Sequence, residues 1–312
     1  MDALVARSVS RTYHSSRGVV RALDNVDMTI AKGRLFAFLG RNGAGKTTFI
    51  KISTALLMPT TGSVQLFGLD VVEHPREVRE QIAIVPQEGK PFYHLTPREH
   101  VEEYLRVRGA TAEAAKSRAD EVLDGMGMLP YQHIPAMVLS GGLQQRTLVA
   151  MVLATEAPFL FLDEPTLGMD PFARRQVWDV IRKAARRGST VLLTTHYLDE
   201  AEQLSEELAV IEGGHVLYRG GAEALKSKVR REVRLQFVGG FTAQELSGYG
   251  EVYSDRSGVT LLTTRDNVEE LTRRALERKI AVNVGPVTLE EAFLTLVGRA
   301  IEDEDADSEA LA

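Results

Sequence analysis

Residues 40–47 combine residue types that suit the binding of a nucleotide. They read GRNGAGKT, in which small residues allow consecutive backbone N–H groups to curl around phosphates. Because a helix is expected to begin at the end of this segment, its positive N-terminus would add to the attraction. Lys46 would reach the β- and γ-phosphates, and Thr47 would hold Mg²⁺. The segment therefore predicts a site for a nucleotide and Mg²⁺.

Two acidic residues follow an apolar run further along the chain. The sequence FLFLDE at residues 159–164 predicts a buried strand that delivers Asp163 near the Mg²⁺. Glu164 could polarise the attacking water as a general base. Because strands often end in acids before a turn, this interpretation depends on the phosphate-binding segment that precedes the strand.

A third motif, LSGGLQQR, occupies residues 139–146. Ser140 and the backbone of Gly141 and Gly142 would open a helix, and so form a second helix N-terminus that attracts anions. An ordinary helix start of the Ser-Gly-Gly type is the simpler alternative.

With this third motif the sequence resembles the ABC ATPase family, whose signature is LSGG followed by a Q-R pair. The resemblance covers about residues 4–225. It implies ATP and Mg²⁺ as ligands, and a dimer in which residues 140–142 of one subunit cap the γ-phosphate of ATP bound to the other. A P-loop kinase or GTPase is not indicated because no guanine-reading N-K-x-D motif is present. A Rossmann dehydrogenase is excluded because GAGKTT lacks the third glycine of its motif.

The resemblance also implies roles for single residues. Tyr13 would stack on adenine, although a half-buried strand aromatic is the alternative. Gln87 would contact Mg²⁺ and water and sense a membrane partner, and residues 166–170 (TLGMD) would cross the dimer interface. Met169 replaces the usual leucine there, a conservative exchange. His196 would touch the γ-phosphate, whereas a lone histidine after a strand is more often polar surface.

Together, the motifs and the resemblance predict three groups of site residues. The catalytic group is Glu164, His196, Gln87 and Lys46. The Mg²⁺ ligands are Thr47, Gln87 and Asp163, the last through a water molecule. The ATP-binding group is Tyr13, Gly40, Arg41, Asn42, Gly43, Ala44, Gly45, Lys46, Thr47, Thr48, Ser140, Gly141, Gly142 and Gln144.

The elements that must position these residues follow from the apolar pattern. Four buried strands are predicted, at residues 34–40, 82–85, 158–162 and 190–194. Helices are predicted between them, at residues 47–57, 97–108, 112–125 and 142–155. This alternation is typical of an α/β fold with a mainly parallel sheet covered by helices, here a P-loop NTPase (RecA-like) core. The opening segment favours antiparallel strands at one edge.

Four regions are expected along the chain. Residues 1–225 would form the nucleotide-binding domain, with an inserted helical subdomain at about 87–157. Residues 226–300 read as a small α+β domain for dimerisation or regulation, with a single strand near 252–262 and a final helix opened by a capping box at Thr288 and Glu291. Residues 301–312, with six acids and no base, read as a disordered tail.

Composition limits the classes of function. Cysteine is absent, which excludes disulfides and thiolate metal sites. The net charge is −6, whereas a nucleic-acid binder usually shows a basic excess. No apolar run is long enough to span a bilayer, and the first residues do not resemble a signal peptide, so membrane work would need another polypeptide.

Two surface segments are open to more than one interpretation. Phe92 and Tyr93 lie in a predicted loop, where they would either meet a membrane partner or pack the helical subdomain. A basic run is expected to form a solvated helix face, rather than to bind nucleic acid, and comprises Arg174, Arg175, Arg182, Lys183, Arg186 and Arg187.

The sequence therefore predicts the ATP-hydrolysing subunit of an ABC transporter. It would lie at the cytoplasmic face of the membrane, as a homodimer or with a related ATPase, and act on a separate integral membrane permease. Residues 287–298 (VTLEEAFLTLVG) resemble the closing helix of export-type ATPases, with Val297 in place of threonine. The alternative is a soluble, non-transport ABC ATPase that acts on nucleic acid or ribosomes.

Overall fold

The computed structural model describes residues 1–15, 18–229, 231–255 and 258–298. The chain divides into two compact units, Met1–Arg219 and Gly220–Ala312. The predicted disordered tail at 301–312 lies outside the described residues. Within the described part of the chain, no helix has the length and apolar character needed to cross a bilayer.

A six-stranded sheet forms the centre of the first unit. Its order is β10-β9-β3-β8-β7-β6, and the pairs β9–β3, β3–β8, β8–β7 and β7–β6 are parallel. Every residue of strands β3, β8 and β7 is buried, which explains why their sequences are largely apolar. The predicted parallel α/β core is thereby confirmed. The strands are β3 (Leu35–Leu39), β6 (Ile82–Val85), β7 (Phe159–Asp163), β8 (Thr190–Thr195), β9 (Glu207–Glu212) and β10 (His215–Gly220).

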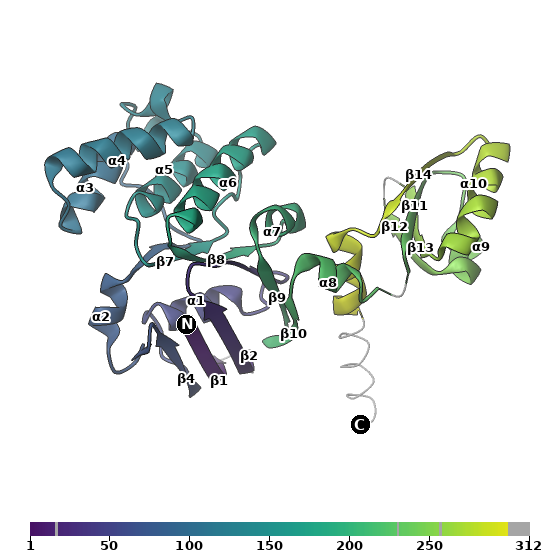
Figure 1. Ribbon diagram of the computed structural model, residues 1–312, viewed down its shortest axis with the longest axis horizontal. Helices are drawn as coiled ribbons and strands as arrows, with labels where there is room; N and C mark the ends of the chain where they lie inside the picture. The colour runs from purple at the N-terminus through teal and green to yellow at the C-terminus, as the bar shows by residue number, and fades with distance from the viewer. Residues whose placement is uncertain (16–17, 230, 256–257, 299–312) are drawn as a thin grey trace. The chain divides into compact units, whose positions relative to one another are not determined.

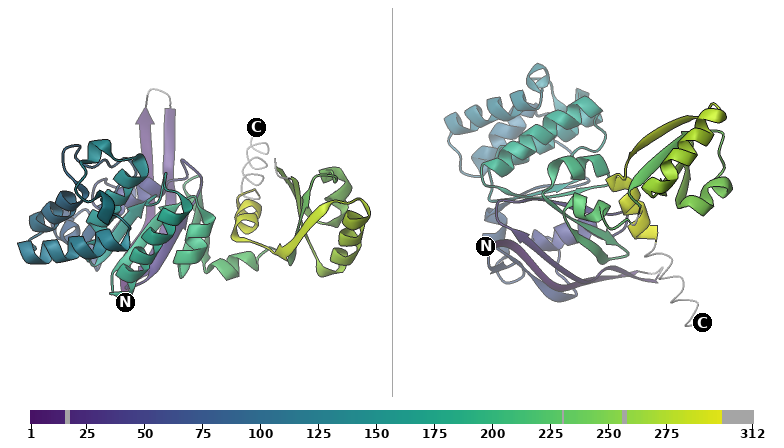
Figure 2. Two further views of the ribbon diagram at one scale, coloured as in Figure 1. Left: turned by 90° about the horizontal axis from the view of Figure 1, so that it is seen from above. Right: turned by 45° about the vertical axis from the view of Figure 1, so that its right-hand side comes forward.

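A second, antiparallel sheet has the order β2-β1-β4-β5. Its strands are β1 (Asp2–Ser15), β2 (Gly18–Ala31), β4 (Thr61–Leu66) and β5 (Leu69–Asp70). Figure 2 shows the two long strands β1 and β2 side by side. Helix α1 (Lys46–Ser53) lies between this sheet and the parallel one (Figure 1), and Phe49 of α1 is buried in the shared core with Leu4 and Phe38. The predicted antiparallel edge is thus a separate sheet.

Helices gather on the other side of the parallel sheet (Figure 1). Three belong to the predicted helical insertion: α3 (Pro97–Val107), α4 (Ala112–Gly125) and α5 (Gly141–Leu153). They pack on one another, and α4 and α5 also pack on α6 (Pro171–Arg186). Side-chain caps start α3, α4, α5 and α6, from Thr96, Thr111, Ser140 and Asp170. The short helices α2 (Pro75–Glu80) and α7 (Leu198–Leu204) complete the unit.

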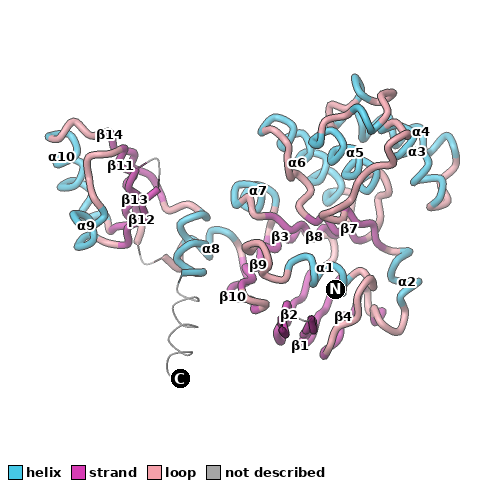
Figure 3. Tube along the Cα trace, turned by 180° about the vertical axis from the view of Figure 1, so that it is seen from behind, coloured by secondary structure: helices cyan, strands magenta, loops and turns pink. Residues whose placement is uncertain are grey.

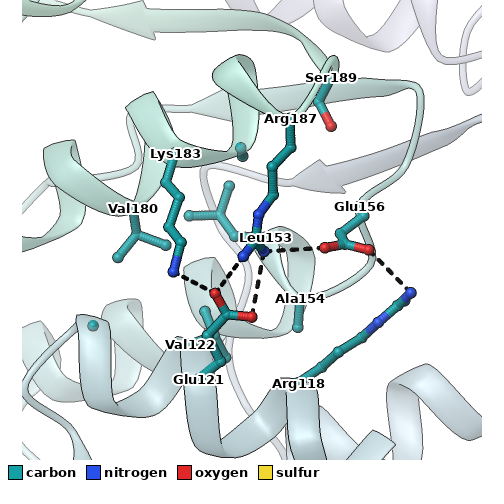
Figure 4. Close-up of a pocket in the computed structure, with 12 residues that line it drawn as sticks. Arg118, Glu121, Val122, Leu153, Ala154, Glu156, Val180, Lys183, Arg187 and Ser189 are labelled. Atoms are coloured by element: carbon teal, nitrogen blue, oxygen red, sulfur yellow. Dashed lines mark hydrogen bonds and ion pairs between the residues drawn. The ribbon is translucent and has the colours of Figure 1, made fainter. Parts of the chain in front are cut away.

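Charged side chains fasten α4 to α6, as Figure 4 shows. Glu121 of α4 is hydrogen-bonded to Lys183, and it accepts a 2.5 Å hydrogen bond from Arg187. Arg187 also donates to Glu156 over 3.1 Å, and Arg118 pairs with Glu156 at 3.0 Å. The hydrogen bonds from Arg187 and Lys183 lower the pKa of Glu121. The predicted solvated basic face is exposed at Lys183 and Arg187, and there the two side chains also pair with acids that join α4 to α6.

The second unit begins with helix α8 (Ala222–Lys226) and contains a four-stranded antiparallel sheet in the order β12-β13-β11-β14. Its strands are β11 (Val233–Val238), β12 (Glu251–Asp255), β13 (Gly258–Thr263) and β14 (Ala281–Pro286). Helices α9 (Ala243–Leu246) and α10 (Val268–Glu277) lie on one side of the sheet (Figure 3). They cover an apolar core that contains Leu235, Phe237 and Leu271.

Two expectations for this unit have different outcomes. The predicted single strand near 252–262 is wrong, because Asp255 pairs with Gly258 and the chain reverses into two strands. The expected capping contact is present before the helix at 289–298, where the Thr288 N–H donates to Glu291 over 2.6 Å.

Candidate nucleotide-binding and catalytic site

The phosphate-binding segment lies between the end of β3 and the start of α1. Gly45 has a φ of 112° and precedes the first helical residue, and Gly43 has a φ of 89°. A Cβ atom added to Gly45 would lie 2.4 Å from the carbonyl oxygen of Ala22. Glycine is therefore required at position 45, both by the left-handed backbone and by the neighbouring chain.

The Lys46 side chain folds back over this segment. Its ammonium group donates to the carbonyl oxygens of Gly40, at 2.7 Å, and Arg41, at 3.1 Å. It also lies 3.8 Å from a carboxylate oxygen of Glu164. Burial lowers the pKa of Lys46, and the charges of Glu164, Asp163 and Glu212 oppose that shift. A largely buried cation is thus held where an anionic ligand would meet it.

A pocket of about 250 Å³ opens over the segment. Its lining residues are Arg41, Asn42, Gly43, Ala44, Gly45, Lys46, Thr47, Thr48, Gln87 and Glu164. The fold therefore brings Gln87 and Glu164, distant in the sequence, to the predicted phosphate-binding residues. Backbone N–H groups, a helix N-terminus and one ammonium group make this pocket suited to phosphates.

Oxygen atoms of the kind that Mg²⁺ prefers come from Thr47 and Gln87, which line this pocket, and from Asp163, whose charge acts on Lys46. The Thr47 hydroxyl donates to the side-chain oxygen of Gln87 over 3.1 Å. Asp163 is buried at the end of β7, and one of its oxygens accepts a 2.5 Å hydrogen bond from Thr194. A hydroxyl, an amide oxygen and a carboxylate form a hard donor set, which fits Mg²⁺.

Glu164 has a strained backbone and a fixed side chain. Its φ is 51°, in the left-handed region, and its N–H donates to the backbone and hydroxyl oxygens of Thr194, both at 3.1 Å. His196, directly after β8, places its Nδ1 atom 2.6 Å from Oε2 of Glu164. The carboxylate is nearly buried, whereas the imidazole is 39% exposed. Glu164, the predicted general base, lines the phosphate pocket and is thereby paired with the imidazole of His196.

The LSGG motif forms a second pocket. Ser140 caps α5, with its hydroxyl accepting from the Leu143 N–H, and Gly142 lies against the backbone of Gly168. This pocket is lined by Ser140, Gly141, Gly142, Leu143, Gln145, Arg146, Leu167, Gly168, Met169 and Asp170. None of these residues lines the phosphate pocket. One copy of the chain thus carries the two predicted ATP-binding surfaces as separate sites.

Three predicted ATP-binding residues, Gly40, Tyr13 and Gln144, are not among the residues that line either pocket. Tyr13 is 37% exposed on β1, with the Arg11 guanidinium 4.9 Å from its ring centre. The Gln144 side chain donates to the carbonyl oxygens of Ala136 and Leu139, and so holds the segment before α5.

Sequence reasoning missed two residues that support Glu164. Thr194 holds both Asp163 and the Glu164 backbone, and the Gln145 side chain donates to the Glu164 carbonyl oxygen over 3.4 Å. Thr194 reads as an ordinary strand residue, so only its position two residues before His196 could have pointed to it. Gln145 lies within LSGGLQQR, and that position is its only signal.

Comparison with known proteins agrees with this geometry. Residues 23–167 match the family model described as ABC transporter. The chain is 35% identical to the daunorubicin/doxorubicin resistance ATP-binding protein of Streptomyces peucetius, over 93% of this chain and 92% of that protein. It is 33% identical to the Nod factor export ATP-binding protein I of Burkholderia orbicola, over 95% and 97%.

A solved structure is similar to a large part of the chain. It is a dimeric ATP-binding cassette in a post-hydrolysis state, bound to ADP and phosphate. The TM-score is 0.65 at 26% sequence identity, and the match covers 70% of this chain and 98% of that one. The predicted P-loop NTPase fold is confirmed by this likeness.

Proposed function

This chain belongs to the ABC transporter family as an ATP-binding, ATP-hydrolysing subunit, and we propose that two such subunits hydrolyse Mg·ATP between them to drive export through a separate permease. The observation that carries the catalytic part is the pair Glu164–His196 beside Lys46. Glu164 orients and deprotonates the attacking water, and His196 holds Glu164 and contacts the γ-phosphate. Lys46 and the backbone of residues 40–47 neutralise the phosphate charge.

We propose Thr47, Gln87 and Asp163 as the residues that hold Mg²⁺, Asp163 through a water molecule. The bound ion would supply positive charge to the phosphate oxygens during hydrolysis. Thr47 and Gln87 already contact each other, so the ion would join α1 to the segment that follows β6. That segment leads into the helical subdomain. The ion would therefore couple ATP binding to the position of the helical subdomain.

The separation of the two pockets supports a shared site. The phosphate pocket of one copy faces solvent without residues 140–142 among its lining. In a head-to-tail dimer, Ser140 and the N-terminus of α5 would close over the γ-phosphate held by the partner subunit. The similar cassette that is dimeric and bound to ADP and phosphate supports this arrangement. Tyr13 remains our proposed adenine contact, and Gln144 our proposed support of the signature segment.

An apolar surface next to Gln87 is the proposed contact for the permease. Phe92 is 76% and Tyr93 53% exposed, and Met137 and Val138 are exposed beside them. The Met137 N–H donates to the Tyr93 carbonyl oxygen over 3.0 Å, so these side chains form one surface. Exposed aromatic and methionine side chains are typical of protein interfaces. The chain would then lie at the cytoplasmic face of the membrane as a peripheral subunit.

The direction of transport is proposed from the relatives. Their names report drug resistance and Nod factor export, and the similarity includes the C-terminal unit. We propose that this unit supports dimerisation or regulation.

Affinity isolation from detergent-solubilised membranes tests the transport assignment. We expect a polytopic membrane protein to be recovered with the wild-type chain, and to be lost with the Phe92→Ser/Tyr93→Ser variant. Val107→Ser is the matched control, because Val107 is an exposed apolar residue of α3 in the same helical group. Recovery of ribosomal or DNA-bound proteins alone would support the non-transport alternative.

A further inference from the structure

Glu200 of α7 is a buried acid that the hydrolytic mechanism does not use. Its exposed fraction is 0%, and one carboxyl oxygen, Oε1, accepts two hydrogen bonds. The Thr166 hydroxyl donates over 2.9 Å, and the indole N–H of Trp178 donates over 2.8 Å. Three segments that are distant in the sequence therefore meet at a single oxygen atom.

The second oxygen, Oε2, is equally buried and makes no hydrogen bond of normal geometry within the described residues. Burial raises the pKa of Glu200, and contacts with Thr195, Trp178 and Thr166 oppose that shift. A buried carboxyl group with an unsatisfied oxygen is costly, and an apolar side chain of similar volume would pack there more favourably. Glu200 is therefore not explained by a contribution to the stability of the fold. Its role is to be found in the segments that it joins.

Those segments are the ones nearest the reaction. Thr166 lies two residues after Glu164 and directly before residues 167–170, which line the LSGG pocket. Glu200 lies four residues after His196. A second contact joins α6 to the residue that follows His196: the Arg174 guanidinium lies 4.5 Å from the ring centre of Tyr197.

We propose that Glu200 is a positioning residue that couples the segment 166–170 to the segment that carries His196. This inference rests on the proposed function, in which residues 166–170 lie at the dimer interface. When a second subunit engages these residues, the shared hydrogen bonds at Glu200 transmit the change to α7 and so to the Glu164–His196 pair. ATP binding at Lys46 does not pass through this link, because Glu200 does not line the phosphate pocket.

The chain provides its own probe of this coupling. Trp178 is the only tryptophan in the sequence, and its indole N–H is one of the two groups that Glu200 holds. Its fluorescence therefore reports this hydrogen bond. The experiment records Trp178 emission on addition of Mg·ATP in the Glu164→Gln background, where hydrolysis is slowed, together with ATP affinity and dimer mass.

We expect Mg·ATP to shift the emission when Glu200 is present. Glu200→Gln keeps an acceptor oxygen, so it should keep the emission response and hold kcat within about twofold in the otherwise wild-type chain. Glu200→Leu should abolish the response and lower kcat by about tenfold or more, with ATP affinity changed by less than about threefold. Thr166→Val removes the hydrogen bond from Thr166 to Glu200, and should likewise abolish the emission response and lower kcat. This variant provides the test if Glu200→Leu does not fold.

Asp179→Asn is the matched control, because it also converts an acid to an amide, but at an exposed position directly after Trp178. It should resemble the wild type. An emission response that survives in Glu200→Leu and Thr166→Val, with kcat unchanged, would overturn the coupling. So would a parallel loss of kcat, ATP affinity and melting temperature, which would indicate a purely structural role. If the chain binds no ATP, the proposed function fails and this inference fails with it.

Discussion

Nδ1 of His196 lies 2.6 Å from Oε2 of Glu164, while Oε1 of the same carboxylate lies 3.8 Å from the ammonium group of Lys46. The arrangement follows from the sheet, because β7 and β8 are neighbouring parallel strands in which Asp163 is paired with Thr194. Residues just past the ends of such strands meet at one edge. Glu164, the proposed base, and His196 are thus brought together by the backbone register of β7 and β8.

Replacing Glu164 by Gln should slow hydrolysis and spare binding. The amide cannot accept the proton of the attacking water, so we expect kcat to fall by about 10²–10⁴-fold. Lys46 and the backbone of residues 40–47 are unchanged, so the affinity for ATP should stay within about threefold. Phosphate release and equilibrium nucleotide binding measure the two effects. A variant that keeps a tenth of the wild-type rate would rule out Glu164 as the base.

His196 and Glu164 should behave as one unit when both are changed. We expect His196→Ala alone to lower kcat by about 10–100-fold, since it removes the hydrogen bond that orients the carboxylate. In the Glu164→Gln background the same change should lower kcat by clearly less than it does alone, because only the proposed contact of His196 with the γ-phosphate remains to be lost. Steady-state kinetics of the four proteins test this, and fully multiplicative effects would show that the two residues act independently.

The charged contact between α4 and α6 should contribute modestly to stability. Arg187 and Glu121 are each at least 40% exposed, so after allowance for solvent screening we expect Arg187→Ala to cost about 0.5–1 kcal/mol. That corresponds to a fall in melting temperature of about 1–4 °C for a unit of this size. Arg175→Ala, an exposed arginine of the same helix, is the control and should change little.

The same contact should depend on pH. The pKa of Glu121 is lowered in the folded chain, so its contribution is present above the unfolded value and is lost as the pH falls through the folded value. The difference between wild type and Arg187→Ala should therefore be largest near neutral pH and disappear in acid. An undiminished difference in acid would show that the Arg187 effect comes from packing.

His100 should make the surface around Phe92 sensitive to mild acid. The ring is buried, its Nε2 atom accepts from the Phe92 N–H over 2.7 Å, and its Nδ1 atom lies 2.9 Å from the Thr96 carbonyl oxygen. Burial lowers the pKa of His100, so below the usual value of 6.5 the unfolded chain takes up a proton that the folded chain does not. Stability should fall as the pH is lowered through this range. Urea unfolding at several pH values should show a smaller slope for His100→Phe, and identical slopes would contradict this account.

Local signals explain the elements that the sequence predicted well. The strand at 82–85 has the predicted bounds, because its apolar run ends at Pro86. The helix at 112–125 also has the predicted bounds, since the Thr111 hydroxyl caps it. The helix predicted to reach residue 57 instead ends at Ser53. Its Thr54 hydroxyl donates to the Ile50 carbonyl oxygen and Ala55 adopts a left-handed φ of 56°, neither of which a propensity argument reveals.

The motifs name the site residues but not their contacts. Gln87 and Thr47 are 40 positions apart, and Glu164 and His196 are 32 apart, so their hydrogen bonds depend on tertiary packing. Glu200 shows most clearly that the sequence alone does not predict such tertiary contacts. In the sequence it is one of several acids near the start of a short helix, which is typical of a solvated turn, whereas in the fold it is buried and links three segments.

Phosphate release by the purified chain, followed at saturating Mg·ATP over a range of protein concentrations, tests the central claim most directly. A site shared by two subunits predicts that the rate per subunit rises with protein concentration and then levels off. It also predicts that Lys46→Ala, Glu164→Gln and Ser140→Arg each abolish most of the activity. A wild-type rate per subunit that is independent of concentration and insensitive to Ser140→Arg would contradict a shared site, and no phosphate release at any concentration would contradict the assignment as an ATPase.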